Sequence, residues 1–410
     1  MPSSKLKIAI LAAHSCPVGE LGAKDTGGMS VYIREVAREL SEQGHSVDVY
    51  TRVHDPADPI VEDLGTRARL IHVRAGQEAK INKLEVYSYL PEFTRNLENF
   101  RLDNNLSYDL VFSHYWLSGL VGQSLQKQWQ VPHVIMFHTL GAVKNDIGVG
   151  AEDPVLRIDA EKELIDSCQC VIAATDKGKE ELEYFYGAMP GKISIVPCGV
   201  NMELFQPVAR NVARQRLGLN NEKTLVFVGR LDPLKGVERL VEAVPHLGDS
   251  PGLKLIIIGG DESSSGEVEK LCQLSSSLGI RDKVNFRGTV KQTELPYYYS
   301  AADICVVPSY YESFGLVALE ALSCGTPVVS ADVGDLKNII LPGKTGYVVK
   351  GNNPEILAGG IARTLKWPTR SAETALAIRA SVGRFSWGYV ASEIASELGK
   401  VLDKWLVPVT

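Results

Sequence analysis

The sequence lacks the features that mark membrane-spanning, exported and broadly basic proteins. No apolar run approaches the ~20 residues that a helix needs to cross a bilayer. Residues 1–11 show no basic region followed by a long apolar stretch and a small-residue cleavage site, so we expect a cytoplasmic protein. The 43 Lys and Arg residues are outnumbered by 49 Asp and Glu residues, which argues against nucleic acid as a partner.

Metal-binding motifs are equally scarce. The seven cysteines are scattered, and Cys168 and Cys170 do not form the C-x2-C pair of a zinc site. The H-E-x-x-H motif is absent, and so is D-x-D, whose paired carboxylates hold a metal–nucleotide complex. We therefore expect buried, reduced cysteines, no metal site and no metal requirement in the chemical step.

The sequence does contain a steady alternation of short β-branched runs and longer amphipathic helical patterns. Strands separated by helix-length segments imply right-handed β-α-β units in an open parallel sheet. The predicted strands are 7–13, 47–51, 109–113, 133–138, 170–175 and 193–197 in the first half, and 224–229, 254–259, 284–287, 303–308, 327–331 and 346–349 in the second. The helical patterns include 29–43, 236–247, 267–279, 292–302 and 315–323.

Residues 201–222 break this rhythm and contain Pro207 and Gly218, so we interpret them as a linker. The prediction is an α/β protein with two doubly wound domains, 1–200 and 223–384. These domains face a cleft, where ligands bind beyond the carboxyl ends of the strands. The last segment, 385–410, has a helical pattern, and we expect it to cross back toward the first domain.

A pair of glycines, Gly27–Gly28, precedes the helical pattern that follows the first strand. Glycine lets a ligand approach the backbone, and the first amides of a helix attract an anion. A tight strand-to-helix turn explains the same pair equally well.

Two cations, Arg230 and Lys235, stand where the first strand of the second domain opens into the cleft. Such a pair can neutralise a diphosphate, since two unit charges ~4 Å apart interact by ~4 kcal/mol at an effective dielectric of ~20. The alternative is two surface cations at the end of a loop.

Two glutamates, Glu312 and Glu320, are separated by about two helical turns around the start of the 315–323 helix. Both can face one groove, and the amides of Phe314 and Gly315 are aimed at a phosphate or sugar oxygen. A solvated helix face is the alternative, but the segment is otherwise apolar, so a polar pair inside it needs partners.

Taken together, these motifs resemble those of retaining glycosyltransferases of family 4, which have the GT-B fold of two Rossmann-like domains. The resemblance covers nearly the whole chain. It implies a hexosyltransferase that moves a sugar from a nucleotide diphosphate to a hydroxyl, with the anomeric configuration retained. The residues that carry it are Gly27–Gly28, His138, Arg230 with Lys235, and Glu312 with Glu320 in an E-x7-E pattern.

Within the family the sequence is most similar to D-inositol-3-phosphate glycosyltransferases and sucrose-phosphate synthases, whose acceptors carry a phosphate. The shared stretches are 25–32, 114–119 and 309–317, whereas residues 334–337 depart from the usual Gly-Gly-Leu-Pro. The implied partners are a UDP-linked sugar and a small phosphorylated acceptor, such as an inositol phosphate or a hexose phosphate. No tightly bound cofactor is implied, and a homodimer is compatible with the sequence.

The resemblance also assigns roles to individual residues. The catalytic positions are His138, Arg230, Lys235 and Glu312. The donor-binding positions are Gly28, Val290, Phe314, Gly315, Leu316, Val317 and Glu320. The positions that hold the acceptor phosphate are Lys83, Tyr115, Thr139 and Arg157.

Other functions stay open at this point. One is a GT-B-like nucleotide-sugar epimerase or hydrolase, and another is a transferase that uses GDP-mannose and a lipid or glycan acceptor. A non-catalytic sugar-nucleotide binder is a third. For the acceptor cluster, the alternative is that Arg157 pairs with Glu161 one helical turn on, and that Tyr115 is a core residue.

Overall fold

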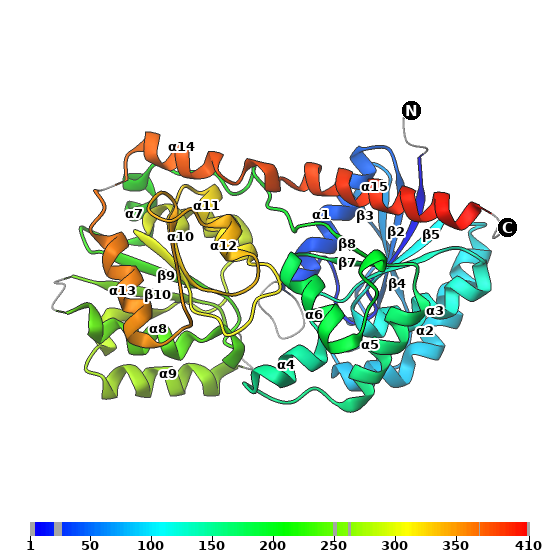
Figure 1. The fold of residues 1–410 in the computed structure, drawn as a ribbon, viewed down its shortest axis with the longest axis horizontal. Helices are drawn as coiled ribbons and strands as arrows, with labels where there is room; N and C mark the ends of the chain where they lie inside the picture. The colour runs from blue at the N-terminus through cyan, green and yellow to red at the C-terminus, as the bar shows by residue number, and fades with distance from the viewer. Residues whose placement is uncertain (1–4, 20–26, 249–251, 261–263, 369, 408–410) are drawn as a thin grey trace.

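The β-branched runs of the sequence form two separate parallel sheets, each covered by helices (Figure 1). The computed structural model describes residues 5–19, 27–248, 252–260, 264–368 and 370–407. Asp25 and Thr26, part of the first shared stretch, lie outside the described residues. The two-domain α/β prediction is confirmed by this arrangement.

The first sheet has the strand order β3-β4-β2-β1-β5-β6-β7-β8 and is parallel except for β3, which pairs antiparallel with β4. Its strands are β1 (Lys7–Leu11), β2 (Ser46–Arg52), β3 (Val61–Gly65), β4 (Ala68–Val73), β5 (Leu110–His114), β6 (His133–Met136), β7 (Cys170–Ala173) and β8 (Ile193–Ile195). Its helices are α1 (Gly28–Glu42), α2 (Lys83–Asp103), α3 (Tyr115–Trp129), α4 (Gly141–Ile147), α5 (Val155–Ser167) and α6 (Asp176–Tyr186).

Two strands of this sheet, β3 and β4, were not among the predicted ones. The sequence of β3, VEDLG, has no apolar run, because β3 is an edge strand whose side chains are exposed or half-buried. Its neighbour β4 is buried and pairs in parallel with β2, so the sheet extends beyond the strands that apolar runs alone predict.

The second sheet has the order β11-β10-β9-β12-β13-β14 and is parallel throughout. Its strands are β9 (Thr224–Val228), β10 (Lys254–Ile258), β11 (Val284–Phe286), β12 (Ile304–Val307), β13 (Val328–Ala331) and β14 (Gly346–Val349). The helices of this half are α7 (Arg210–Leu217), α8 (Val237–Ala243), α9 (Ser265–Ser277), α10 (Leu295–Ala301), α11 (Leu316–Ser323), α12 (Leu336–Ile339), α13 (Pro354–Leu365) and α14 (Ala372–Ala380).

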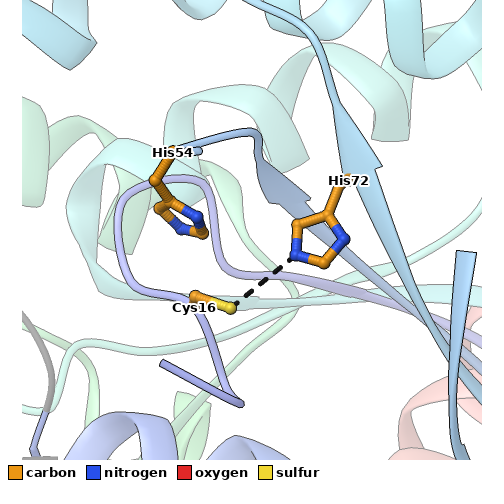
Figure 2. A group of neighbouring side chains, drawn as sticks. All are labelled: Cys16, His54 and His72. Carbon is orange, nitrogen blue, oxygen red and sulfur yellow. Dashed lines mark hydrogen bonds between the residues drawn. The ribbon is translucent and has the colours of Figure 1, made fainter. Parts of the chain in front are cut away.

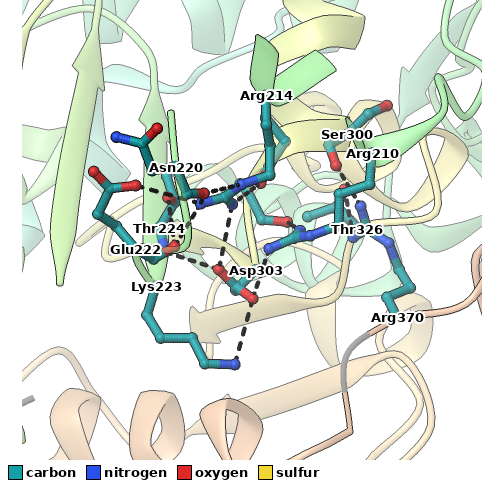
Figure 3. A network of polar contacts seen from close by, with 12 residues as sticks. Arg210, Arg214, Asn220, Glu222, Lys223, Thr224, Ser300, Asp303, Thr326 and Arg370 are labelled. Carbon is teal, nitrogen blue, oxygen red and sulfur yellow. Dashed lines mark hydrogen bonds and ion pairs between the residues drawn. The ribbon is translucent and has the colours of Figure 1, made fainter. Parts of the chain in front are cut away.

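The segment interpreted as a linker contains α7, which is attached to the second sheet by ionic contacts (Figure 3). Asp303, directly before β12, is the centre of these contacts. One carboxylate oxygen accepts from Arg210 Nη2 at 2.9 Å, and the other accepts from the backbone N–H of Thr224 at 2.8 Å. The carboxylate therefore joins α7 to the first residue of β9.

The C-terminal helix α15 (Trp387–Leu406) leaves the second domain and packs along α1, as the sequence predicts (Figure 1). The Gln43 side-chain amide donates to the carbonyl of Gly388 at 2.9 Å. The two connections between the domains also touch each other, since the N–H of Val200 donates to the carbonyl of Phe385 at 2.7 Å.

The cysteines are free thiols, and all are buried except the half-exposed Cys272. Among the described helices, none combines the length and the apolar character that a membrane span requires.

Candidate active site

A cavity of about 340 Å³ opens between the two domains, where the strands of both sheets end. It collects every residue selected from the sequence except Arg157. Those of the first domain are Gly28, Lys83, Tyr115, His138 and Thr139, and those of the second are Arg230, Lys235, Val290, Glu312, Phe314, Gly315, Leu316, Val317 and Glu320.

A larger hollow of about 720 Å³ lies between α2 and α3, away from this cleft. It is lined by residues such as Tyr87, Arg95 and Gln128, and none of the residues selected from the sequence reaches it. Size alone therefore does not identify the site, whereas convergent polar groups do.

Lys235 and Glu312 meet at the wall of the cavity formed by the second domain. The Lys235 ammonium donates to Glu312 Oε1 at 2.7 Å, and the Ser309 hydroxyl donates to the same oxygen at 2.8 Å. Gly236, at φ 62°, is required here, because an added Cβ would lie 2.3 Å from the carbonyl oxygen of Pro308. The loop after β9 is thus held against the loop after β12, with Arg230 on the same wall.

The start of α11 forms the adjacent part of this wall. Gly315 precedes the helix at φ 118°, and a Cβ there would lie 2.5 Å from Leu336 Cδ2. Residues 334–337, which depart from the family's usual Gly-Gly-Leu-Pro, pack against this turn. The N–H of Asp335 donates to the carbonyl of Phe314 at 3.2 Å. The first amides of α11 are therefore presented to the cavity by a turn that only glycine fits well.

Glu320 lies further along α11, at the inner end of the cavity. Tyr299 donates a hydrogen bond from its hydroxyl to Glu320 Oε2 at 2.7 Å. Burial raises the pKa of Glu320 from 4.5 to about 7. A partner that donates hydrogen bonds to this carboxylate, such as a diol, would favour its ionised form.

His138 faces the second domain from the end of β6, with a strained backbone at φ 62°. Its Nε2 is 2.9 Å from Nδ1 of His114, so one of these two nitrogens carries the shared hydrogen. Burial lowers the pKa of His138 to about 3. The imidazole is therefore neutral at physiological pH and acts as a hydrogen-bonding group rather than a cation.

Tyr115 is the centre of the polar cluster on the first domain. It opens α3 at φ 74°, a conformation rare for a large side chain. The Lys83 ammonium lies 5.6 Å from the centroid of its ring, and the Arg157 guanidinium lies 4.8 Å from it. Arg157 also donates to the Thr139 hydroxyl at 3.1 Å. The structure thus brings together all four residues assigned to the acceptor phosphate.

Arg157 itself does not reach the cavity surface, and its side chain is only 2% exposed. It pairs with Glu161 at 2.7 Å and with Asp153 at 2.8 Å, so the alternative contact considered for it is present. Burial lowers the pKa of Arg157, but Glu161, Tyr115 and Asp153 outweigh this and raise it above its usual range. Arg157 therefore supports Thr139 and Tyr115 from behind.

Several lining residues were not selected from the sequence. His14 follows β1, and its ring lies against that of Tyr115 with a centroid distance of 4.5 Å and the ring planes tilted by 36°. Tyr32, on α1, makes an edge-to-face contact with His138, with 5.2 Å between the ring centroids. The Gln292 side-chain oxygen accepts a hydrogen bond from Arg34 of α1 at 3.0 Å. The available signal for His14 was its place directly after a predicted strand, whereas Gln292 joins the site only through the packing of the two domains.

Comparison with known proteins decides the family. Residues 26–204 match the family described as Glycosyltransferase Family 4, and residues 209–379 match the one described as Glycosyl transferases group 1. A D-inositol 3-phosphate glycosyltransferase from Catenulispora acidiphila is 38% identical over 98% of this chain and 97% of its own length. The chain belongs to glycosyltransferase family 4.

Other relatives of this family 4 glycosyltransferase agree over the full length. A D-inositol 3-phosphate glycosyltransferase from Corynebacterium diphtheriae is 36% identical over 96% of this chain and 94% of its own. The structure of sucrose-phosphate synthase from Thermosynechococcus elongatus is 33% identical, with a TM-score of 0.88 over 98% of this chain and 100% of its own. Anabaena HepE, solved with UDP and glucose, is 19% identical and shares the fold at a TM-score of 0.75. The family 4 chain is thus a GT-B hexosyltransferase.

Proposed function

We propose that this enzyme transfers a hexose from a UDP-linked donor to a hydroxyl of a small phosphorylated acceptor, with the anomeric configuration retained. The observation that carries the proposal is the single cavity with two different walls. The second domain supplies Lys235, Arg230 and the start of α11, while the first supplies the cluster around Tyr115. The names of the two inositol-phosphate enzymes and of sucrose-phosphate synthase support an acceptor of this class.

The wall of the second domain fits the donor. Lys235 and Arg230 neutralise the departing diphosphate, whose negative charge grows as the glycosidic bond breaks. Glu312 and the amides of Phe314 and Gly315 hold hydroxyls of the donor sugar, and Val290 and the first turn of α11 complete the pocket. Glu320 accepts from the ribose hydroxyls.

The chemistry that fits this arrangement is a front-face displacement. The acceptor oxygen attacks the anomeric carbon on the side from which the diphosphate leaves, and the leaving phosphate oxygen takes the acceptor proton. Neutral His138 contacts the donor sugar near the reacting carbon. Glu312 is already paired with Lys235, so it is a poor candidate for the covalent nucleophile of a double displacement.

The wall of the first domain fits a phosphate dianion. Lys83 provides a cation, and Tyr115 and Thr139 provide hydroxyl donors at the cavity surface. Arg157, one layer deeper, keeps Thr139 and Tyr115 in place. Closure of the two walls would exclude water and limit hydrolysis of the donor. A cytoplasmic location, a homodimeric assembly and chemistry without a catalytic metal belong to the same proposal.

The test is a panel of nucleotide sugars incubated with and without acceptors. We expect nucleotide release that requires a phosphorylated acceptor and that is faster with UDP-sugars than with GDP-mannose. Release without an acceptor would indicate a hydrolase, and an altered donor sugar would indicate an epimerase. Equal rates with inositol and inositol phosphate would overturn the phosphorylated acceptor while leaving the family assignment intact.

A further inference from the structure

A cysteine and two histidines meet outside the set of residues that line the cleft (Figure 2). Cys16 lies in the loop after β1, His54 lies just beyond β2, and His72 is in β4. Because β4, β2 and β1 are neighbours in the sheet, their ends bring the three side chains together. The Cys16 sulfur and one nitrogen of each histidine all lie within 4.8 Å of one another.

The hydrogen bonds of His72 fix which of its nitrogens can accept a ligand. Its Nδ1 is 2.7 Å from the carbonyl oxygen of Pro59, and a carbonyl only accepts, so Nδ1 carries the hydrogen. The lone pair of the neutral ring is then on Nε2, which lies 3.8 Å from the Cys16 sulfur. The ring is thus oriented with its free electron pair toward the thiol.

His54 is oriented in the same way by a carboxylate. Its Nδ1 is 3.1 Å from Asp58 Oδ2, while its Nε2 is buried and makes no hydrogen bond. The same carboxylate oxygen accepts from the backbone N–H groups of His54 and Asp55, each at 3.0 Å. Because this oxygen acts as an acceptor, Nδ1 donates to it, and the buried Nε2 makes no hydrogen bond, which is costly unless something binds there.

We propose that Cys16, His54 and His72 form a binding site for a divalent transition-metal ion, with Zn²⁺ as the best fit. One thiolate and two imidazoles are ligands that zinc prefers, and water would complete four-coordination. Tetrahedral zinc with bonds of about 2.0–2.3 Å places its ligand atoms ~3.3–3.6 Å apart, so no two ligand atoms need to approach by more than about 1.5 Å. Asp58 and the Pro59 carbonyl are the outer partners that orient ligating histidines in such sites.

Binding exchanges a proton for the metal and involves no redox step. In the metal-free protein Cys16 is a buried, free thiol. On binding, the S–H bond breaks, the proton goes to solvent, and the sulfur lone pair forms the bond to the metal. The two histidines bind as neutral rings and release nothing.

The consequence for the enzyme lies in the loop that carries Cys16. His14 and Ser15, the residues immediately before it, line the cavity between the domains. Ser15 also shares a 2.7 Å hydrogen bond with Ser30 of α1. A metal bound at Cys16 would fix this loop to the ends of β2 and β4 and hold the His14 ring against Tyr115. The metal binding itself does not depend on the proposed function.

The test uses the full chain, freed of metal by a chelator and titrated with Co²⁺ as a spectroscopic probe. We expect a thiolate-to-cobalt charge-transfer band in the near ultraviolet that saturates at one ion per chain and is abolished by Zn²⁺. Cys16→Ser should remove this band. The matched control is Cys168→Ser, because Cys168 is another buried thiol of the first domain and belongs to no group of potential metal ligands among the residues that the structure describes.

Two further variants keep the test decisive if Cys16→Ser does not fold. His54 has a side chain that is 17% exposed, so His54→Gln should fold, and we expect it to weaken Zn²⁺ binding by at least tenfold. Asp58→Asn should weaken it by about 10–100-fold, as loss of an outer partner does. Zn²⁺ should raise the Tm of the wild type and not that of His54→Gln. The absence of a saturable cobalt band, or equal bands in Cys16→Ser and Cys168→Ser, would overturn the proposal.

Discussion

The two walls of the cleft hold their cations in different ways. On the first domain, Arg157 is 2% exposed and is bound by two carboxylates, Glu161 and Asp153. On the second domain, Lys235 is 24% exposed and pairs with one carboxylate, Glu312. The buried ion pairs of Arg157 are fixed before any substrate arrives, whereas Lys235 is exposed enough for the proposed diphosphate to compete with Glu312 for it. The first domain therefore offers a preorganised framework, and the second offers an exchangeable charge.

Removal of Arg157 should have the largest effect on the protein. Arg157→Ala leaves Glu161, whose side chain is fully buried, without its cation, and we expect unfolding free energy to fall by about 3–5 kcal/mol. In the protein that still folds, KM for the phosphorylated acceptor should rise by about tenfold or more, and the preference over the unphosphorylated form should narrow. Donor affinity should hardly change. Denaturant unfolding, together with kcat/KM for both acceptor forms, measures these effects.

A double variant separates the two consequences. Adding Glu161→Gln to Arg157→Ala removes the unpaired charge, so part of the lost stability should return while the acceptor preference stays reduced. Full recovery of that preference would show that Arg157 serves only to pair with Glu161.

Lys235→Ala tests the exchangeable charge of the second domain. The proposed role of Lys235 is to neutralise the departing diphosphate, so we expect kcat to fall by about 10²–10³-fold. Stability should change little, because Glu312 remains partly exposed to water. Steady-state kinetics and thermal unfolding check both statements. The control is Arg239→Ala, since Arg239 lies on α8 outside the cavity, and near-normal turnover of Lys235→Ala would contradict the assigned role.

Glu320 should make the stability of the folded protein depend on pH. Its folded pKa of about 7 lies above the usual 4.5, so the folded state holds the proton more tightly and stability falls as pH rises between these values. Glu320→Gln should therefore raise the unfolding free energy of the donor-free enzyme by up to ~3 kcal/mol at pH 8, and by almost nothing at pH 4. Donor affinity should fall in the same variant. Unfolding curves at both pH values and a donor titration measure these effects. An equal increase in unfolding free energy at pH 4 and at pH 8 would contradict a buried charge at Glu320.

The smallest expected effect is that of Mg²⁺ or Mn²⁺ on turnover. In the proposed mechanism Lys235 and Arg230 neutralise the leaving group, so omitting these ions should change kcat by less than about twofold. A complete loss that either ion restores would show that an ion neutralises the leaving group.

The sequence predicted the parts of the site that follow directly from strand ends. Lys235 comes after β9 and Glu312 after β12, and adjacent parallel strands bring such residues to one edge. It did not predict that Arg157 lies behind the cavity. Glu161 follows Arg157 by one helical turn, and this spacing is compatible both with an ion pair between them and with acceptor binding by Arg157. Nor did it reveal the cluster of Cys16, His54 and His72. Their spacing matches no motif, and only the order β4-β2-β1 makes them neighbours.

The contact between Val200 and Phe385 limits how the enzyme can move. A single flexible connection would let the two domains twist, slide and close independently. Here the chain crosses twice, and the crossings are joined by a backbone hydrogen bond of 2.7 Å. Two joined crossings restrict twisting and sliding more than one connection would, so we expect closure to pivot near Val200 and Phe385. Trp387, two residues after Phe385, makes an edge-to-face contact with Tyr32, with 5.5 Å between the ring centroids. Because Tyr32 lines the cavity, this contact connects the crossing segment to the cavity wall. Each cycle of opening and closing should therefore return the donor to the same trajectory relative to the acceptor.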